Sequence, residues 1–94
     1  MKIVINEKHG GFGLSDEAEM KYKGILGIVD ANFYAGVDAT RDCPVLVALV
    51  EEMGERANSC YSRLKVVEIP DDADWYIEEY DGMEWIAEVH RTWR

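Results

Sequence analysis

The hydrophobic positions near the two ends of the chain predict β-strands. Lys2–Asn6 is a short run rich in β-branched residues. Leu64–Ile69 has the same character and stops at Pro70 and the Asp71-Asp72 turn. We therefore expect one strand at the start of the chain and another after its first two-thirds.

Two aromatic-rich runs close the chain and predict a β-hairpin. Trp75–Tyr80 and Met83–Val89 are separated only by Asp81-Gly82, a pair of residues that strongly favours a two-residue hairpin turn. That turn fixes the register and places Glu79 directly opposite Glu84, where like charges destabilise a sheet. Such a conflict either marks a functional site or lies at a turn in water, where it costs a few tenths of a kcal/mol.

Helical patterns occupy the region between the strands. Ser15 is a favourable N-cap for a helix from Asp16 to about Lys23, which Gly24 and Gly27 should end. A second helix has a broad apolar face, and its expected features are Asp42 as the cap, Pro44 in the first turn and an end near Asn58. For Ile25–Val37 the pattern fits a strand or an apolar loop.

Together these elements predict an α+β fold. We expect a small, mainly antiparallel sheet of about four strands with two helices packed on one face. The 94 residues are enough for one domain, 1–94, with its own core. Four aromatic residues of the last third either fill that core against the Pro44–Asn58 helix or include exposed anchors for a partner, and the first alternative is our default; they are Trp75, Tyr80, Trp85 and Trp93.

The net charge of −9 comes entirely from one segment. Between Val66 and Val89 there is no lysine or arginine, and outside that segment the acidic and basic residues balance. The acidic residues alternate with tryptophan, tyrosine and isoleucine, which is atypical of a solvated acidic tail and indicates a folded anionic surface. Its nine members are Glu68, Asp71, Asp72, Asp74, Glu78, Glu79, Asp81, Glu84 and Glu88.

This charge disfavours two classes of partner. Nucleic-acid backbones and anionic membranes both require lysine and arginine. No apolar run approaches the roughly 18–20 residues that span a bilayer, and the start of the chain does not resemble a signal peptide. We expect a cytoplasmic protein in which Cys43 and Cys60 are small buried or half-buried thiols, since their spacing fits no zinc or redox motif.

Several longer stretches resemble a family of small bacteriophage and prophage proteins. They are Lys2–Asn6, Gly10–Ser15, the Pro44–Asn58 helix, and the closing segments Leu64–Asp72, Ile77–Gly82, Glu84-Trp85 and His90–Trp93. The resemblance covers roughly two-thirds of the chain and implies a phage setting rather than an activity. The chain departs from the family at Lys8-His9, where a Cys-Tyr pair is usual, and in a shorter middle around Ile25–Arg41. By looser analogy, a compact acidic phage protein is similar to anti-CRISPR and anti-restriction inhibitors that imitate DNA.

The glycine-rich loop between the first strand and the first helix has two interpretations. A strand, a glycine loop and a helix N-terminus form many phosphate sites. However, Gly10–Gly13 matches neither the dinucleotide nor the P-loop spacing, and Asp16 and Glu17 would repel a phosphate. The loop is better explained as a tight turn that places Phe12 or Leu14 on the core.

The remaining candidate chemistry is weak. The carboxylates of Glu79 and Glu84 are close enough in the predicted hairpin to share a proton or a cation, but no ion-binding loop or catalytic histidine accompanies them. No serine or cysteine has the motif of an activated nucleophile. We therefore expect no enzyme activity, no metal and no cofactor.

The leading hypothesis is a phage-encoded inhibitor of a host defence system. It would bind a basic, nucleic-acid-binding host protein, for example a CRISPR effector, through carboxylates that imitate phosphates. The runner-up is a small-molecule binder that sequesters a nucleotide signal, using Gly10–Gly13 and Arg41, Arg91 or Arg94; a third alternative is a structural phage protein. The expected partner-binding residues are Glu68, Asp71, Asp72, Asp74, Glu78, Glu79, Glu84 and Glu88.

Overall fold

The computed structural model describes residues 1–89 and confirms the α+β class. None of the helices in this part of the chain has the length and apolar character to cross a membrane. Its elements, in chain order, are β1 (Lys2–Asn6), α1 (Asp16–Leu26), α2 (Ala35–Asp38), α3 (Pro44–Met53), the 3-10 helix η1 (Gly54–Ala57), β2 (Leu64–Glu68), β3 (Trp75–Tyr80) and β4 (Met83–Glu88).

The four strands form two antiparallel ribbons rather than one sheet. β1 pairs with β2, and β3 pairs with β4 in the predicted register, with Tyr80 opposite Met83. Within residues 1–89, no strand pairs with the second edge of β1. Instead, the Val4 amide donates to the carbonyl of Arg41 at 2.9 Å, and the Asn6 amide donates to a carboxylate oxygen of Glu84 at 2.8 Å. An irregular segment and a side chain thus satisfy backbone groups that a neighbouring strand would otherwise pair.

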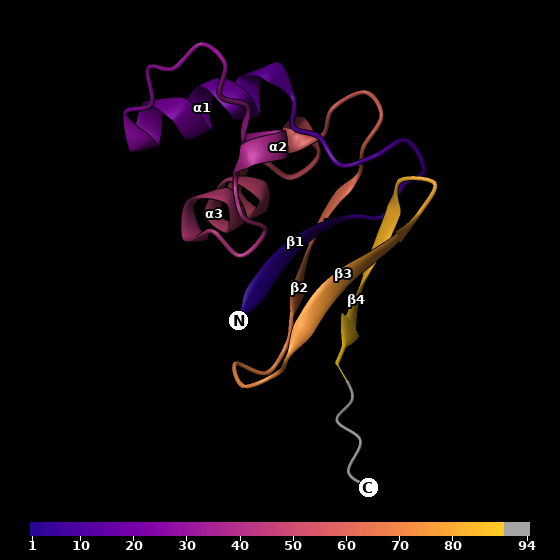
Figure 1. Ribbon diagram of the computed structural model, residues 1–94. Helices are drawn as coiled ribbons and strands as arrows, with labels where there is room; N and C mark the ends of the chain where they lie inside the picture. Colours follow the sequence, from indigo (N-terminus) through magenta and orange to yellow (C-terminus); the bar gives the residue numbers. More distant parts are fainter. Residues whose placement is uncertain (90–94) are drawn as a thin grey trace, which may run out of the picture.

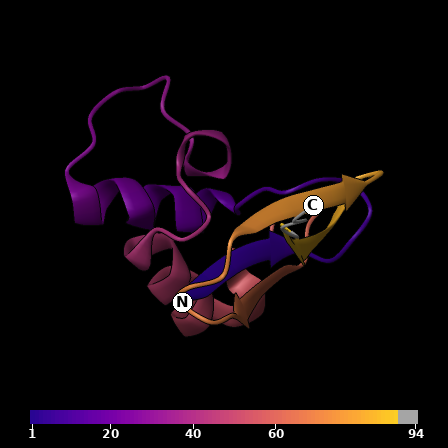
Figure 2. The same ribbon diagram turned by 60° about the horizontal axis from the view of Figure 1, so that its bottom comes forward.

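The β1–β2 ribbon lies between the helices and the β3–β4 hairpin (Figures 1 and 2). Val4 belongs to the buried cluster on the helical side, together with Leu46 of α3. Ile3 and Ile5 point to the opposite face because side chains alternate along a strand. They are buried too, so the hairpin covers them. The prediction of two main helices on one face is confirmed for α1 and α3.

The helix boundaries agree only in part with the prediction. The Ser15 side chain caps α1 as expected, accepting from the Ala18 amide at 3.1 Å. α1 continues through Gly24 to Leu26, and the left-handed Gly27 alone ends it. Cys43, not Asp42, is the N-cap of α3, and no side chain caps that helix. α3 stops at Met53, and the chain continues as η1 up to the predicted end near Asn58.

The middle of the chain contains no strand between residues 25 and 37. Its first residues complete α1, and its last ones begin the short helix α2, which was not predicted. A carboxylate of α1 holds α2 in place: Glu19 accepts from the amides of Ala35 and Gly36 at 2.7 and 2.9 Å. A hydrogen-bond partner from a distant element explains why the local pattern did not reveal this turn of helix.

The expectation that the aromatics of the last third fill the core is wrong for the described residues. Trp75 is only half-buried, and Tyr80 and Trp85 are exposed; Trp93 lies outside the described residues. The hairpin is a thin layer with one covered face, so it cannot enclose its own large side chains. The core consists mainly of aliphatic residues and Tyr22, with these large members: Ile3, Val4, Ile5, Leu14, Leu46, Val47, Leu49, Val50 and Met53.

Candidate functional site

Five of the eight expected binding carboxylates gather at one end of the two ribbons. β2 ends at Glu68, and the turn into β3 carries the next three acidic residues. Glu88 joins them because it faces Trp75 in the hairpin register, and the Val89 amide donates to the carbonyl of Asp74 at 2.8 Å. We call this set the acidic end: Glu68, Asp71, Asp72, Asp74 and Glu88.

Three side chains of the acidic end line an open hollow of about 470 Å³. These are Asp72, Asp74 and Glu88, and Pro70, Ala73 and Val89 complete the lining. Within residues 1–89, every charged residue that lines the hollow is therefore acidic. The turn is fixed on its other side, where the N-terminal ammonium donates to the carbonyl of Ile69 at 2.7 Å (Figure 1 shows the N-terminus beside this turn).

Two cations among residues 1–89 lie close to the acidic end, and each is paired with a carboxylate. The N-terminal ammonium contacts Asp71 and lowers the pKa of that carboxyl through a hydrogen bond and its charge. Lys2, which lies opposite Glu68, donates to Glu51 of α3 at 3.0 Å. Neither cation lines the hollow. Within residues 1–89, the cations that contact Asp71 and face Glu68 thus lie outside the hollow lined by Asp72, Asp74 and Glu88.

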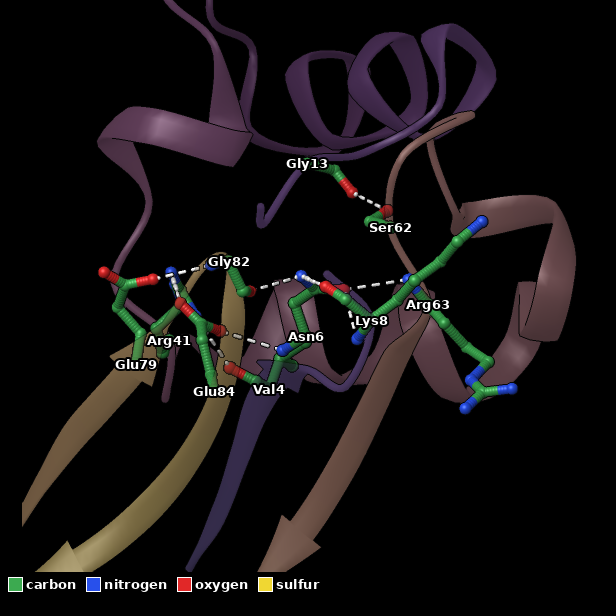
Figure 3. Close-up of polar contacts among 10 residues, drawn as sticks. All are labelled: Val4, Asn6, Lys8, Gly13, Arg41, Ser62, Arg63, Glu79, Gly82 and Glu84. Carbon is green, nitrogen blue, oxygen red and sulfur yellow. Dashed lines mark hydrogen bonds and ion pairs between the residues drawn. The ribbon is translucent and has the colours of Figure 1, made fainter. Parts of the chain in front are cut away.

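Glu84 does not belong to the exposed surface, and the structure corrects the expectation for this residue. Its side chain is 8% exposed and lies between the hairpin and β1 (Figure 3). Both carboxylate oxygens accept from the guanidinium of Arg41, at 2.7 and 2.8 Å, and one also accepts from the Asn6 amide. Arg41 additionally donates to the carbonyl of Val4 at 3.3 Å. This fork joins the hairpin to the edge of β1.

The predicted clash between Glu79 and Glu84 is resolved by separate partners. The residues are opposite each other, as the register requires. Glu84 is paired with Arg41, whereas exposed Glu79 accepts from the amide of Gly82 at 2.8 Å and stabilises the hairpin turn. The pair therefore does not mark a proton-sharing site. With Glu78 on the outer face, three of the expected carboxylates lie apart from the acidic end and from one another, so the eight do not form one patch.

The roles of two residues at this junction, Arg41 and Asn6, did not follow from the sequence. Arg41 follows the Ile25–Val37 stretch and was considered only as one of three arginines for a nucleotide. Asn6 is fully buried, and its side-chain amide donates to the carbonyls of Lys8 and Gly82, both at 2.7 Å, and accepts from the amides of Lys8 and Arg63 (Figure 3). Each hydrogen-bonding position of this amide is filled. A polar residue at the end of an apolar strand gives no sign of such a role in a single sequence.

The glycine-rich loop packs against the hairpin turn. The Gly10 amide donates to the carbonyl of Asp81 at 3.3 Å, and a Cβ placed on Gly82 would lie 2.3 Å from the Gly11 nitrogen. The loop ends with Leu14 in the core, as the tight-turn interpretation expects. The guanidinium of Arg41, one of three arginines that the nucleotide alternative named, is paired with Glu84. Arg91 and Arg94, the other arginines of that alternative, lie outside the described residues.

The two cysteines lie in different environments. Cys43 is half-buried, as expected, but Cys60 is exposed. The Tyr22 hydroxyl lies 3.3 Å from the Cys43 sulfur, and burial raises the pKa of Tyr22 to about 12. Burial opposes ionisation of the Cys43 thiol, but hydrogen bonds from Tyr22 and the start of α3 outweigh it and lower the thiol pKa. Among residues 1–89 no three histidine, cysteine or acidic side chains are grouped to hold a metal ion.

No family model, curated protein or solved structure matches the chain. The resemblance to phage proteins therefore stays a prediction from the sequence. A function for the protein has to be proposed from the placement and chemistry of its own residues.

Proposed function

We propose that the protein is an inhibitory interaction protein that occupies the nucleic-acid-binding surface of a basic host protein. The observation that carries the proposal is the acidic end, where Asp72, Asp74 and Glu88 line one open hollow and are its only charged residues within the described range 1–89. Exposed carboxylates on a folded frame present negative charge to lysine and arginine in the same way as phosphates. The partner is expected to have a surface of the kind that normally holds DNA or RNA.

The frame behind the acidic end supports this function. The turn between β2 and β3 is held by the Val89 amide on one side and by the N-terminal ammonium on the other. Carboxylates held in place lose less conformational freedom on binding than those on a disordered tail, so more of the electrostatic attraction remains as affinity. A net charge of −9 also accelerates the encounter with a basic partner at low salt.

The biological setting comes from the resemblance to phage proteins. A small acidic phage protein in the bacterial cytoplasm meets host nucleases and defence complexes that bind nucleic acid. Inhibition of such a complex, for example a CRISPR effector, requires only that the acidic end covers the channel for DNA or RNA. The protein itself then needs neither a catalytic residue nor a cofactor.

Capture from a bacterial lysate tests the proposal when DNA is used as the competitor. The full chain is immobilised, incubated with lysate at low salt and eluted first with duplex DNA and then with high salt. We expect a captured protein that binds DNA on its own and is released by duplex DNA. A protein that stays bound in excess DNA but leaves in high salt would contradict occupancy of a nucleic-acid surface, because the two ligands would then not compete.

A further inference from the structure

The outer face of the β3–β4 hairpin presents exposed aromatic side chains to solvent. Tyr76, Tyr80 and Trp85 are 42%, 72% and 43% exposed, and they point away from the face that carries Glu84. Large aromatics on an open strand face are unusual unless they contact a partner, because interface hot spots are enriched in tyrosine and tryptophan. This face does not include the acidic end.

A carboxylate is held among these aromatics. Glu78 lies opposite Trp85 in the hairpin. One of its oxygens accepts from the Tyr76 hydroxyl at 3.0 Å, and the other accepts from the indole nitrogen of Trp85 at 2.9 Å. Each carboxylate oxygen can accept a second hydrogen bond, so both remain able to receive a planar pair of N–H donors. The two aromatic donors fix the orientation of the carboxylate before any ligand arrives.

The described part of the chain offers this carboxylate no cation. No lysine or arginine occurs from Trp75 to Glu88. The three arginines among residues 1–89 are paired elsewhere: Arg41 with Glu84, Arg56 with Glu17 and Arg63 with Glu7. The face is therefore complementary to a positive group that residues 1–89 do not supply.

The inner side of the same hairpin shows what kind of cation fits such a set of groups. There Glu84 binds both terminal nitrogens of the Arg41 guanidinium, whose carbon lies 3.5 Å from the centre of the Phe12 ring. A carboxylate fork and an aromatic face together hold one arginine. On the outer side, Glu78 and Trp85 provide the same two kinds of group.

We propose that the outer hairpin face binds an arginine side chain of a partner protein. Glu78 receives two guanidinium N–H groups, and the indole of Trp85 provides the flat surface on which the guanidinium stacks. Arginine is favoured over lysine because an ammonium group cannot form the planar fork and stacks less well. This inference uses a surface separate from the acidic end, so it holds or fails independently of the proposed inhibition of a nucleic-acid-binding protein.

Two short fluorescent peptides test the inference, one of alternating glycine and arginine and the other of alternating glycine and lysine. Fluorescence anisotropy measures their binding to the full-length protein at equal ionic strength. We expect the arginine peptide to bind the wild type about tenfold more tightly than the lysine peptide. Glu78→Gln and Trp85→Ala should each bring the two affinities close together, and Tyr76→Phe should narrow the difference because it removes one donor that orients Glu78.

Glu79→Gln is the matched control. It removes the same charge from the adjacent position of β3, on the other face, and the amide oxygen can still accept from the Gly82 amide. This variant should keep the preference for arginine. Equal affinity of the wild type for both peptides, or an unchanged preference in Glu78→Gln, would overturn the inference. Charge reversal of Asp72 and Glu88, which tests the acidic end, should weaken the binding of both peptides by the same factor. The ratio of the two affinities should therefore stay unchanged.

Discussion

At the scale of single residues, Glu84 shows how a distant partner changes the meaning of a local pattern. The sequence predicted its position opposite Glu79 and the conflict between the two charges. It could not predict that Arg41, from an irregular segment 43 positions away, would neutralise one of them. Period-two patterns determine which residues share a face of a hairpin, but they carry no information about what lies against that face.

The Arg41–Glu84 pair leads to a prediction about stability. Glu84→Gln leaves the guanidinium of Arg41 without a charged partner at the junction between β1 and the hairpin. We expect the free energy of unfolding to fall by about 2–4 kcal/mol, because the Arg41 guanidinium then remains charged and partly buried without a charged partner. Urea denaturation followed by far-ultraviolet circular dichroism measures the change.

Glu88→Gln is the control for this substitution. Glu88 lies on the same strand and the same face, but its side chain is exposed. The free energy of unfolding of this variant should stay within about 0.5 kcal/mol of the wild-type value. If the two variants unfold at the same urea concentration, the Arg41–Glu84 pair does not hold the hairpin to β1.

At the scale of elements, the hairpin and its register were predictable, whereas its burial was not. The Asp81-Gly82 turn fixes the pairing from local chemistry alone. Both faces of the hairpin mix acidic and aromatic residues, so the pattern gave no basis for choosing the covered face. The contact between Gly82 and the glycine-rich loop determines which face of the hairpin is covered. Because Gly10, Gly11 and Gly82 have no side chains, the two backbones can approach closely.

Two glycine substitutions test this contact. Gly82 has a φ of +89°, and an added Cβ would lie within 2.6 Å of the nitrogens of Gly10 and Gly11. Gly82→Ala should therefore destabilise the protein by about 2 kcal/mol or more. Gly24→Ala is the counterpart, since Gly24 lies inside α1 with no neighbouring atom within 4 Å of the added carbon. Gly24→Ala should stabilise the protein by about 0.5–1 kcal/mol.

Thermal unfolding of both variants gives the comparison. The account expects the melting temperature to fall for Gly82→Ala and to rise for Gly24→Ala. A Gly82→Ala protein that melts like the wild type would show that the hairpin turn does not rest on the glycine-rich loop.

At the scale of the whole molecule, the sequence showed which segment carries the excess negative charge. It did not show how the acidic residues of that segment are distributed in space. The segment from Val66 to Val89 does carry the net charge, and it is folded. The hairpin, however, separates the acidic residues that follow each other along the chain. Five gather at the end where β2 turns into β3, and the others lie on the outer face, at the turn or in the junction with β1. Only the three-dimensional arrangement identifies the acidic end as the place with the highest density of carboxylates.

The most direct test of the central claim compares two double charge reversals with the same net charge. Asp72→Lys with Glu88→Lys alters the acidic end, whereas Glu52→Lys with Glu55→Lys alters exposed positions of α3 and η1. The measurement is displacement of duplex DNA from the host protein captured in the lysate experiment. The account predicts that the first variant loses at least about tenfold in potency, while the second stays close to the wild type. An equal loss in both variants would contradict it, because total charge rather than the acidic end would then determine binding.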